Sequence, residues 1–152
     1  MRMRLRKPKA ALVLSIIVAL LSACSLPDEI NQSMNYVDNT TAYINDASAF
    51  ANQVRARAEE AASNPEALDE LKQELVTMKE KIVSFNAIEA PTLAKNIHNQ
   101  LIGYNETLLT EINGVLENIN DKVNLNALMD SEIIQTIKQI VDIQERVEQL
   151  GL

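Results

Sequence analysis

The chain has 152 residues, with 14 basic and 21 acidic side chains, one histidine and one cysteine. A single cysteine excludes an intramolecular disulfide and a zinc site built from cysteines. Beyond the first nine residues the charged side chains are scattered without a basic stripe, which excludes nucleic acid as a partner.

The chain opens with a short basic stretch and an apolar run. The first nine residues, MRMRLRKPK, carry five basic side chains and no acid, and the run from Ala10 to Leu21 is broken only by Ser15. These are the charged and hydrophobic regions of a signal peptide in their usual order. The run is shorter than the roughly 20 residues that cross a bilayer. We therefore predict a removable signal peptide at residues 1–23 in preference to a permanent transmembrane helix.

The apolar run ends in LSAC, Leu21 to Cys24, which resembles the lipobox of bacterial lipoproteins. The resemblance implies that the Cys24 thiol becomes a thioether to diacylglycerol and that the signal is cut before it. Two acyl chains hold a protein on a membrane where one would let it leave. The alternative is an ordinary buried thiol. We predict lipid attachment at Cys24, a tether over residues 24–30, and anchoring on the extracytoplasmic face of the cell membrane.

Removal of the signal makes the chain more acidic. All 21 acids follow Cys24 but only nine of the 14 bases do, so the mature chain carries −12 where the precursor carries −7. Anionic headgroups repel such a chain, and its acidity alone indicates a well-solvated surface.

The mature chain predicts an all-α fold. It has only three glycines and no alternating β-branched run between turns, which argues against a sheet. Over residues 28–62, apolar or small residues recur at the three-and-four spacing of a helix face. They are Ile30, Met34, Val37, Thr41, Ile44, Ala47, Ala51, Val54, Ala58 and Ala61. Cap-forming residues in the first half of this segment predict a frayed start.

A second helix is predicted over residues 64–88, with Asn64 as its N-cap and Pro65 in its first turn. Its apolar stripe comprises Leu68, Leu71, Leu75, Met78, Ile82 and Phe85. Pro91 restricts Ala90 to an extended conformation, so the helix ends there or kinks.

A third helix is predicted over residues 91–120, and a polar break, NDKVNLNALMDS, separates it from a fourth helix that stops near Gly151. The inward positions of the third are Leu93, Ile97, Leu101, Tyr104, Leu108, Ile112, Val115 and Ile119. Those of the fourth are Ile133, Ile137, Ile140, Val147 and Leu150. Short connections near residues 63 and 89 favour antiparallel neighbours. The predicted fold is an elongated antiparallel bundle of three long helices and a shorter fourth, over residues 31–152.

No pattern for chemistry is found. A carboxylate-bridged metal pair in a bundle needs Glu-x-x-His, but the only histidine, His98, has Lys95 three residues earlier. A nucleophile elbow, a Ser-x-x-Lys pair and a glycine-rich phosphate loop are all missing. His98 is interpreted as a residue on the bundle flank, with a proton or ligand role as the alternative. We expect no enzyme activity, no catalytic residue, no cofactor and no metal ion.

Three aromatic residues, Tyr36, Tyr43 and Phe50, recur every seven positions along the first helix. A wide apolar arc is typical of a well-buried helix, so core packing is the first interpretation. Aromatic residues are also favoured at interfaces, so the same three remain candidate partner-binding residues.

Several stretches together resemble a family of small, uncharacterised lipoproteins from Gram-positive, spore-forming bacteria. They are LSAC, NYVDNTTAYINDASAFA, NPEAL, the junction from MKEKIVSFN to EAP, and EQLGL. The resemblance spans nearly the whole mature chain and implies the outer leaflet of a single cytoplasmic membrane. It brings no catalytic residue or ligand.

The functional expectation is a membrane-anchored lipoprotein whose bundle is a helical protein-interaction or structural module at the cell surface, with an envelope protein as the candidate partner. The alternative is a small-molecule carrier or sensor that uses a cavity between helices.

Overall fold

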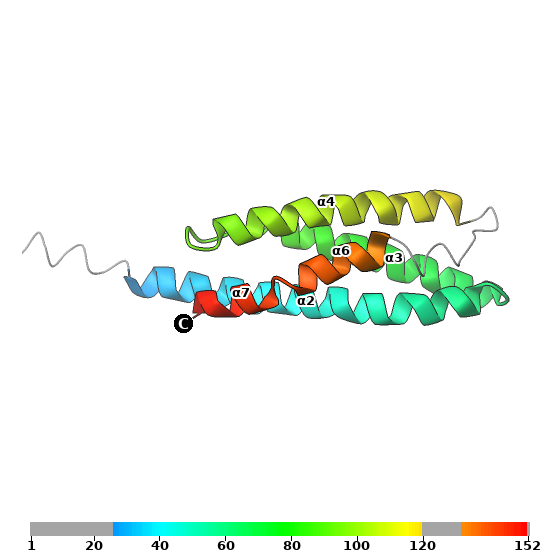
Figure 1. The fold of residues 1–152 in the computed structure, drawn as a ribbon, viewed down its shortest axis with the longest axis horizontal. Coiled ribbons are helices and arrows are strands. Elements are labelled where there is room, and N and C mark those ends of the chain that lie inside the picture. The colour runs from blue at the N-terminus through cyan, green and yellow to red at the C-terminus, as the bar shows by residue number, and fades with distance from the viewer. Residues whose placement is uncertain (1–25, 120–131, 152) are drawn as a thin grey trace, which may run out of the picture.

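The computed structural model describes residues 26–119 and 132–151. The predicted signal peptide, Cys24 and the polar break over residues 120–131 lie outside the described residues. Within them the chain forms an elongated bundle of antiparallel helices, which confirms the predicted all-α fold (Figure 1). In chain order the elements are α2 (Leu26–Ala61), α3 (Pro65–Asn86), α4 (Lys95–Asn118), α6 (Glu132–Val141), α7 (Gln144–Glu148) and the short 3-10 helix η2 (Gln149–Gly151).

The turn between α2 and α3 is set by local hydrogen bonds. The backbone N–H groups of Ser63 and Asn64 donate to the carbonyl oxygen of Glu60, which closes α2. The Asn64 side chain then accepts from the Glu66 N–H at 3.0 Å, and Pro65 occupies the first turn of α3, where its missing N–H is no loss. The predicted start of the second helix is confirmed.

The helices form a four-cornered bundle. Both α3 and α6 pack against α2 and against α4, which puts α2 and α4 at opposite corners. The apolar stripes of all four face one another, as amphipathic helices require. Their fully buried members include Ile44 and Val54 from α2, Leu71, Leu75 and Ile82 from α3, Leu101, Leu108 and Ile112 from α4, and Ile133, Ile137 and Ile140 from α6.

Three residues predicted to face inward are exposed instead. Ile30 is 57% and Met34 52% exposed at the start of α2, and Leu93 is 75% exposed before α4. The Ala94 N–H donates to the Pro91 carbonyl oxygen in a turn, so α4 begins only at Lys95 and Leu93 lies outside the helix. Periodicity identifies the face of a helix, but not how far its neighbours extend along it.

The predicted fourth helix is interrupted by a turn. Residues 142 and 143 form a turn between α6 and α7, in which the Ile143 N–H donates to the carbonyl oxygen of Ile140. The apolar stripe nevertheless runs on through Ile140, Ile143 and Val147, all buried.

At the other end of the chain, α2 begins at Leu26, so helix occupies most of the stretch that the sequence assigned to a tether at residues 24–30.

Candidate functional site

The three aromatic residues of α2 lie in the core. Tyr36, Tyr43 and Phe50 are 2%, 5% and 7% exposed. Side chains buried this far belong to the core, which supports core packing as the first interpretation, and their role as partner-binding residues stays a prediction. The reason is the position of α2, which packs against α3, α6 and α7 and is covered over a wide arc.

Their seven-residue spacing is matched on the helices across the core. Buried positions with the same spacing occur on α4 and on α3: His98, Asn105 and Ile112, and Phe85, Met78 and Leu71. Seven residues are two helical turns, so each set stays on one face and the core is built in layers. Two of these layers are polar.

The first polar layer joins α2 to α4 across the bundle. Tyr36 Oη lies 3.3 Å from Nδ1 of His98, and the two rings meet edge to face with centroids 5.7 Å apart. The Thr40 hydroxyl donates to the Tyr36 carbonyl oxygen at 2.7 Å. His98 is 6% exposed, so its predicted place on the bundle flank is wrong and it lies in the core.

The second polar layer lies seven residues further along both helices. The Tyr43 hydroxyl donates to Oδ1 of Asn105, and the Asn105 amide donates to Oδ1 of Asn86 at 2.7 Å. The Tyr43 ring stacks on Phe85 with centroids 4.4 Å apart, and Phe85 in turn lies 5.3 Å from the His98 ring. In these two layers each polar side chain therefore has a hydrogen-bond partner, which is the condition for a polar core that stabilises.

Burial sets the protonation states in these layers. It lowers the pKa of His98 and raises the pKa of the Tyr43 hydroxyl, because both charged forms would lose their hydration. It also raises the pKa of Tyr36. The layers are neutral near pH 7, and Tyr36 and Tyr43 contact His98 and Asn105 across the bundle. This arrangement joins α2, α3 and α4 in one register.

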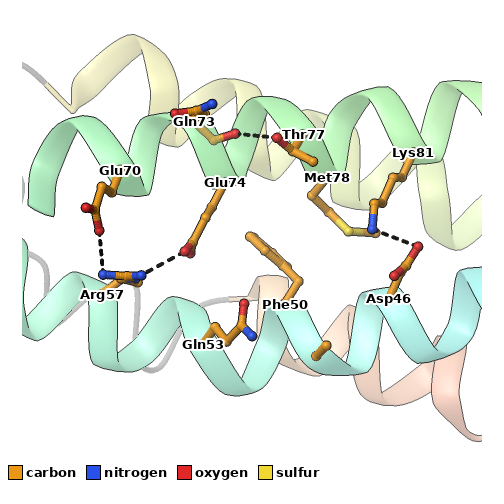
Figure 2. A pocket seen from close by; sticks show the side chains of 11 residues that line it. Asp46, Phe50, Gln53, Arg57, Glu70, Gln73, Glu74, Thr77, Met78 and Lys81 are labelled. Carbon is orange, nitrogen blue, oxygen red and sulfur yellow. Dashed lines mark hydrogen bonds and ion pairs between the residues drawn. The ribbon is translucent and has the colours of Figure 1, made fainter.

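A surface groove runs between α2 and α3, with a volume of about 490 Å³ (Figure 2). Phe50 and Met78 contribute its apolar part. The polar side chains that line it are Asp46, Gln53, Arg57, Glu70, Gln73, Glu74, Thr77 and Lys81. Sequence reasoning missed this groove, because nothing in the linear pattern says which exposed residues of two helices face each other.

Ion pairs cross the groove near both of its ends. Arg57 reaches Glu70 at 2.5 Å and Glu74 at 3.1 Å, and Lys81 reaches Asp46 at 2.7 Å. The other Glu74 oxygen, Oε2, is buried without a hydrogen-bond partner. Arg57 and Lys81, the two cations that line the groove, are each paired with its acids.

Two further searches bear on the site. In residues 26–119 and 132–151, no three His, Cys, Asp or Glu side chains gather as metal ligands would. Across the same described ranges, no helix has the length and apolar character to cross a membrane. Cys24, the predicted lipid attachment residue, lies outside the described part of the chain, two positions before α2 begins.

Comparison with protein families matches residues 36–150 to the family of unknown function DUF6376. The chain belongs to this family. It is also similar to the Uncharacterized lipoprotein YybP of Bacillus subtilis (strain 168), at 32% identity over 137 residues, which cover 88% of this chain and 93% of that protein. No solved structure matches it. The DUF6376 match and the lipoprotein relative confirm the predicted resemblance to uncharacterised lipoproteins of Gram-positive bacteria.

Proposed function

We propose that this DUF6376 protein is a lipoprotein held by a lipid on Cys24 at the extracytoplasmic face of the cell membrane, and that its bundle is a non-enzymatic module that binds another envelope protein. The observation that carries the proposal is the position of the only cysteine. It ends the LSAC motif and precedes the folded bundle by two residues, in a chain related to a lipoprotein.

The anchoring follows from the chemistry of the attached group. A diacylglyceryl group inserts two acyl chains, and each buried methylene contributes about 0.8 kcal/mol, so the attachment is stable without a membrane-crossing helix. The reaction uses up the only thiol in the chain, so the bundle is stabilised by packing and by its buried hydrogen bonds.

Two features of the bundle support an interaction module: its buried titratable groups are already hydrogen-bonded, and one of its helices exposes apolar side chains. Its buried titratable groups, Tyr36, Tyr43 and His98, are engaged in the polar layers. Its outer face on α3 exposes two aliphatic residues seven positions apart, Val76 and Val83, which are 43% and 55% exposed. A rigid helical face is a common recognition element for protein partners.

Metabolic labelling tests the anchor. Cells that express the full chain are fed a clickable fatty acid and then fractionated. We expect the label and the membrane fraction to contain the native protein, and Cys24→Ala to lose the label. Label retained on Cys24→Ala, or absent from the native protein, would contradict the proposed attachment.

Photo-cross-linking in intact cells tests the interaction module. A photoactivatable amino acid replaces Val83, and the matched control carries it at Glu117, an exposed position on α4. We expect one reproducible envelope-protein adduct from position 83, lost when Cys24→Ala removes the anchor. Adducts that are equal from both positions would mean random encounters and would reject a specific partner face.

A small-ligand carrier remains the second candidate, and the α2–α3 groove favours it. The groove is open and largely polar, so the ligand expected is a small polar molecule. A ligand that binds only the folded state raises the melting temperature. In a thermal-shift screen, Ala49→Trp should abolish any such rise by filling the groove, whereas Ala56→Trp, at an exposed position outside it, should not.

A further inference from the structure

The start of α2 exposes two apolar side chains on a stripe that is buried further along. Ile30 and Met34 are 57% and 52% exposed, whereas Val37 is half-buried and Ile44 is fully buried. Residues four apart lie one above the other on a helix, so Ile30 and Met34 form a single patch. Nothing in the described bundle covers this patch.

The patch lies where α2 projects beyond its neighbours. The connection between α3 and α4, residues 88–92, shares a pocket with α2 residues 32–39, so it lies level with that part of the helix. The turns before residue 32 extend past it, as Figure 1 shows at the blue end of α2. Ile30 is therefore at the tip of the molecule, and Met34 lies one turn behind it, level with the connection.

The tip is also where the proposed lipid is attached, and the inference rests on that attachment. Only Ser25 separates Cys24 from Leu26, and two residues span at most about 7 Å. At a helical rise of 1.5 Å per residue, Ile30 lies about 6 Å and Met34 about 12 Å beyond Leu26. The headgroup layer of one leaflet is roughly 5–8 Å deep, so an upright α2 would leave Met34 in water and a tilted one would bring both side chains to the lipid.

Charge is sparse along the stretch of α2 that begins at the patch. Between Ile30 and Asn45 the chain carries one charged side chain, Asp38, although the mature protein carries −12 overall. The surface around the patch consists of uncharged amides and hydroxyls, such as Asn31, Gln32 and Ser33. Asp28 and Glu29 precede the patch on the anchored side, so the surface that meets little repulsion from a bilayer is the stretch from Ile30 onward.

We infer that the first turns of α2 lie against the bilayer, with Ile30 and Met34 at the boundary between headgroups and acyl chains. The bundle is then held tilted on the membrane by the lipid and this patch together, and does not swing on a single point. The partner of this surface is the lipid itself.

The chain contains no tryptophan and one cysteine, which allows a direct test. Mature protein, residues 24–152, is coupled through Cys24 to a maleimide-headgroup lipid in phosphatidylcholine vesicles, with or without brominated acyl chains. Ile30→Trp and Met34→Trp place the reporter in the patch. Val76→Trp, at an exposed apolar position on α3, is the matched control; its neighbour Thr77 shares a groove with Asp46 of α2, about three turns beyond Met34.

We expect bromine to quench position 30 and position 34 with a shift of their emission to shorter wavelength, and to leave position 76 unquenched. Equal, unquenched emission at all three positions would overturn the inference. A shift at 30 and 34 that grows with protein density but not with bromine would mean that a second copy covers the patch, and would also overturn it. Because coupling is chemical, these outcomes do not depend on whether cells lipidate Cys24, which the labelling experiment tests separately.

Discussion

Tyr43 shows how much a single hydroxyl contributes to this core. It donates to Asn105, whose amide donates to Asn86, so removing the hydroxyl leaves a buried acceptor without its donor. We expect Tyr43→Phe to destabilise the fold by about 1–3 kcal/mol, the usual result of leaving a buried polar group unpaired. Urea unfolding followed by circular dichroism measures the change.

The control is the third tyrosine. Tyr104 is half-buried and accepts from Gln100 at 3.1 Å, on the exposed side of α4. Tyr104→Phe should lie within about 0.5 kcal/mol of the native protein, as surface changes usually do. A Tyr43→Phe variant that is equally benign would show that Asn105 finds another donor and that the layer is not needed.

His98 should make stability depend on pH in a definite direction. Burial lowers its pKa below the ordinary value of 6.5, so on acidification the unfolded chain binds a proton before the folded chain does. Stability contributed by neutral His98 is therefore complete above pH 6.5 and is lost as pH falls from there to the folded pKa. We expect the difference in unfolding free energy between native protein and His98→Gln to shrink between about pH 8 and about pH 5.

Comparison with His98→Gln is needed because Glu111 acts in the opposite sense. Burial raises the pKa of the Glu111 carboxyl, so the folded chain keeps this proton to a higher pH than the unfolded chain does. The stability that protonated Glu111 contributes is therefore lost as pH rises from the ordinary pKa of 4.5. Subtracting the two unfolding curves removes the Glu111 effect. A difference that stays constant or grows on acidification would mean that His98 is protonated within the fold.

At the level of single residues, the sequence identified buried positions better than partners. The seven-residue recurrence of Tyr36, Tyr43 and Phe50 correctly suggested core packing, but His98 was placed on the flank. The signal that would have placed it is the identical spacing of His98, Asn105 and Ile112 on the third helix. Which of two matched sets meets the other depends on register, and register is a property of the assembled bundle.

Among the elements, α3 depends on its cap. Asn64 accepts from the Glu66 N–H at 3.0 Å, which satisfies one of the four donors at the helix start. We expect Asn64→Ala to lower the unfolding free energy by about 1 kcal/mol and Asn64→Asp to retain it, because an aspartate also caps. Urea unfolding again provides the measurement, and equal stability of all three proteins would show that water replaces the cap.

Helix boundaries were predictable where the backbone chemistry is local. Asn64 and Pro65 set the start of α3, whereas its end at Asn86 falls two residues before the predicted end and five before Pro91. The later start of α4 at Lys95 depends on a turn from Pro91 to Ala94, and the interruption after α6 falls at Asp142, where no proline or glycine marks it. The α2–α3 groove could not be predicted from the sequence either, because it forms only when the two helices pack against each other.

At the scale of the whole molecule, short connections and four apolar stripes were sufficient to predict an antiparallel bundle. They were not sufficient to predict its tip. Ile30 and Met34 belong to the same apolar stripe as Ile44. Only the positions of the neighbouring helices show that this stripe extends beyond the helices that bury it. The sequence likewise suggested an anchor at Cys24, but not that α2 begins two residues later. Because the connection is so short, the orientation of the bundle on the membrane depends on what the first turns of α2 contact.

Net charge should govern how salt affects the stability of the whole bundle. Two effects oppose each other: salt weakens surface ion pairs such as Lys81 with Asp46, but it also screens the repulsion within a chain of net charge −12. Exposed pairs contribute about 0–1 kcal/mol each, whereas repulsion acts among all the acids. We therefore expect the melting temperature of residues 24–152 to rise as sodium chloride increases from about 0.01 M to about 0.15 M, which shortens the screening length from about 30 Å to about 8 Å. Replacing the exposed acids Glu59, Glu117 and Glu145 by glutamine should reduce that rise, and a fall in melting temperature would show that the ion pairs dominate.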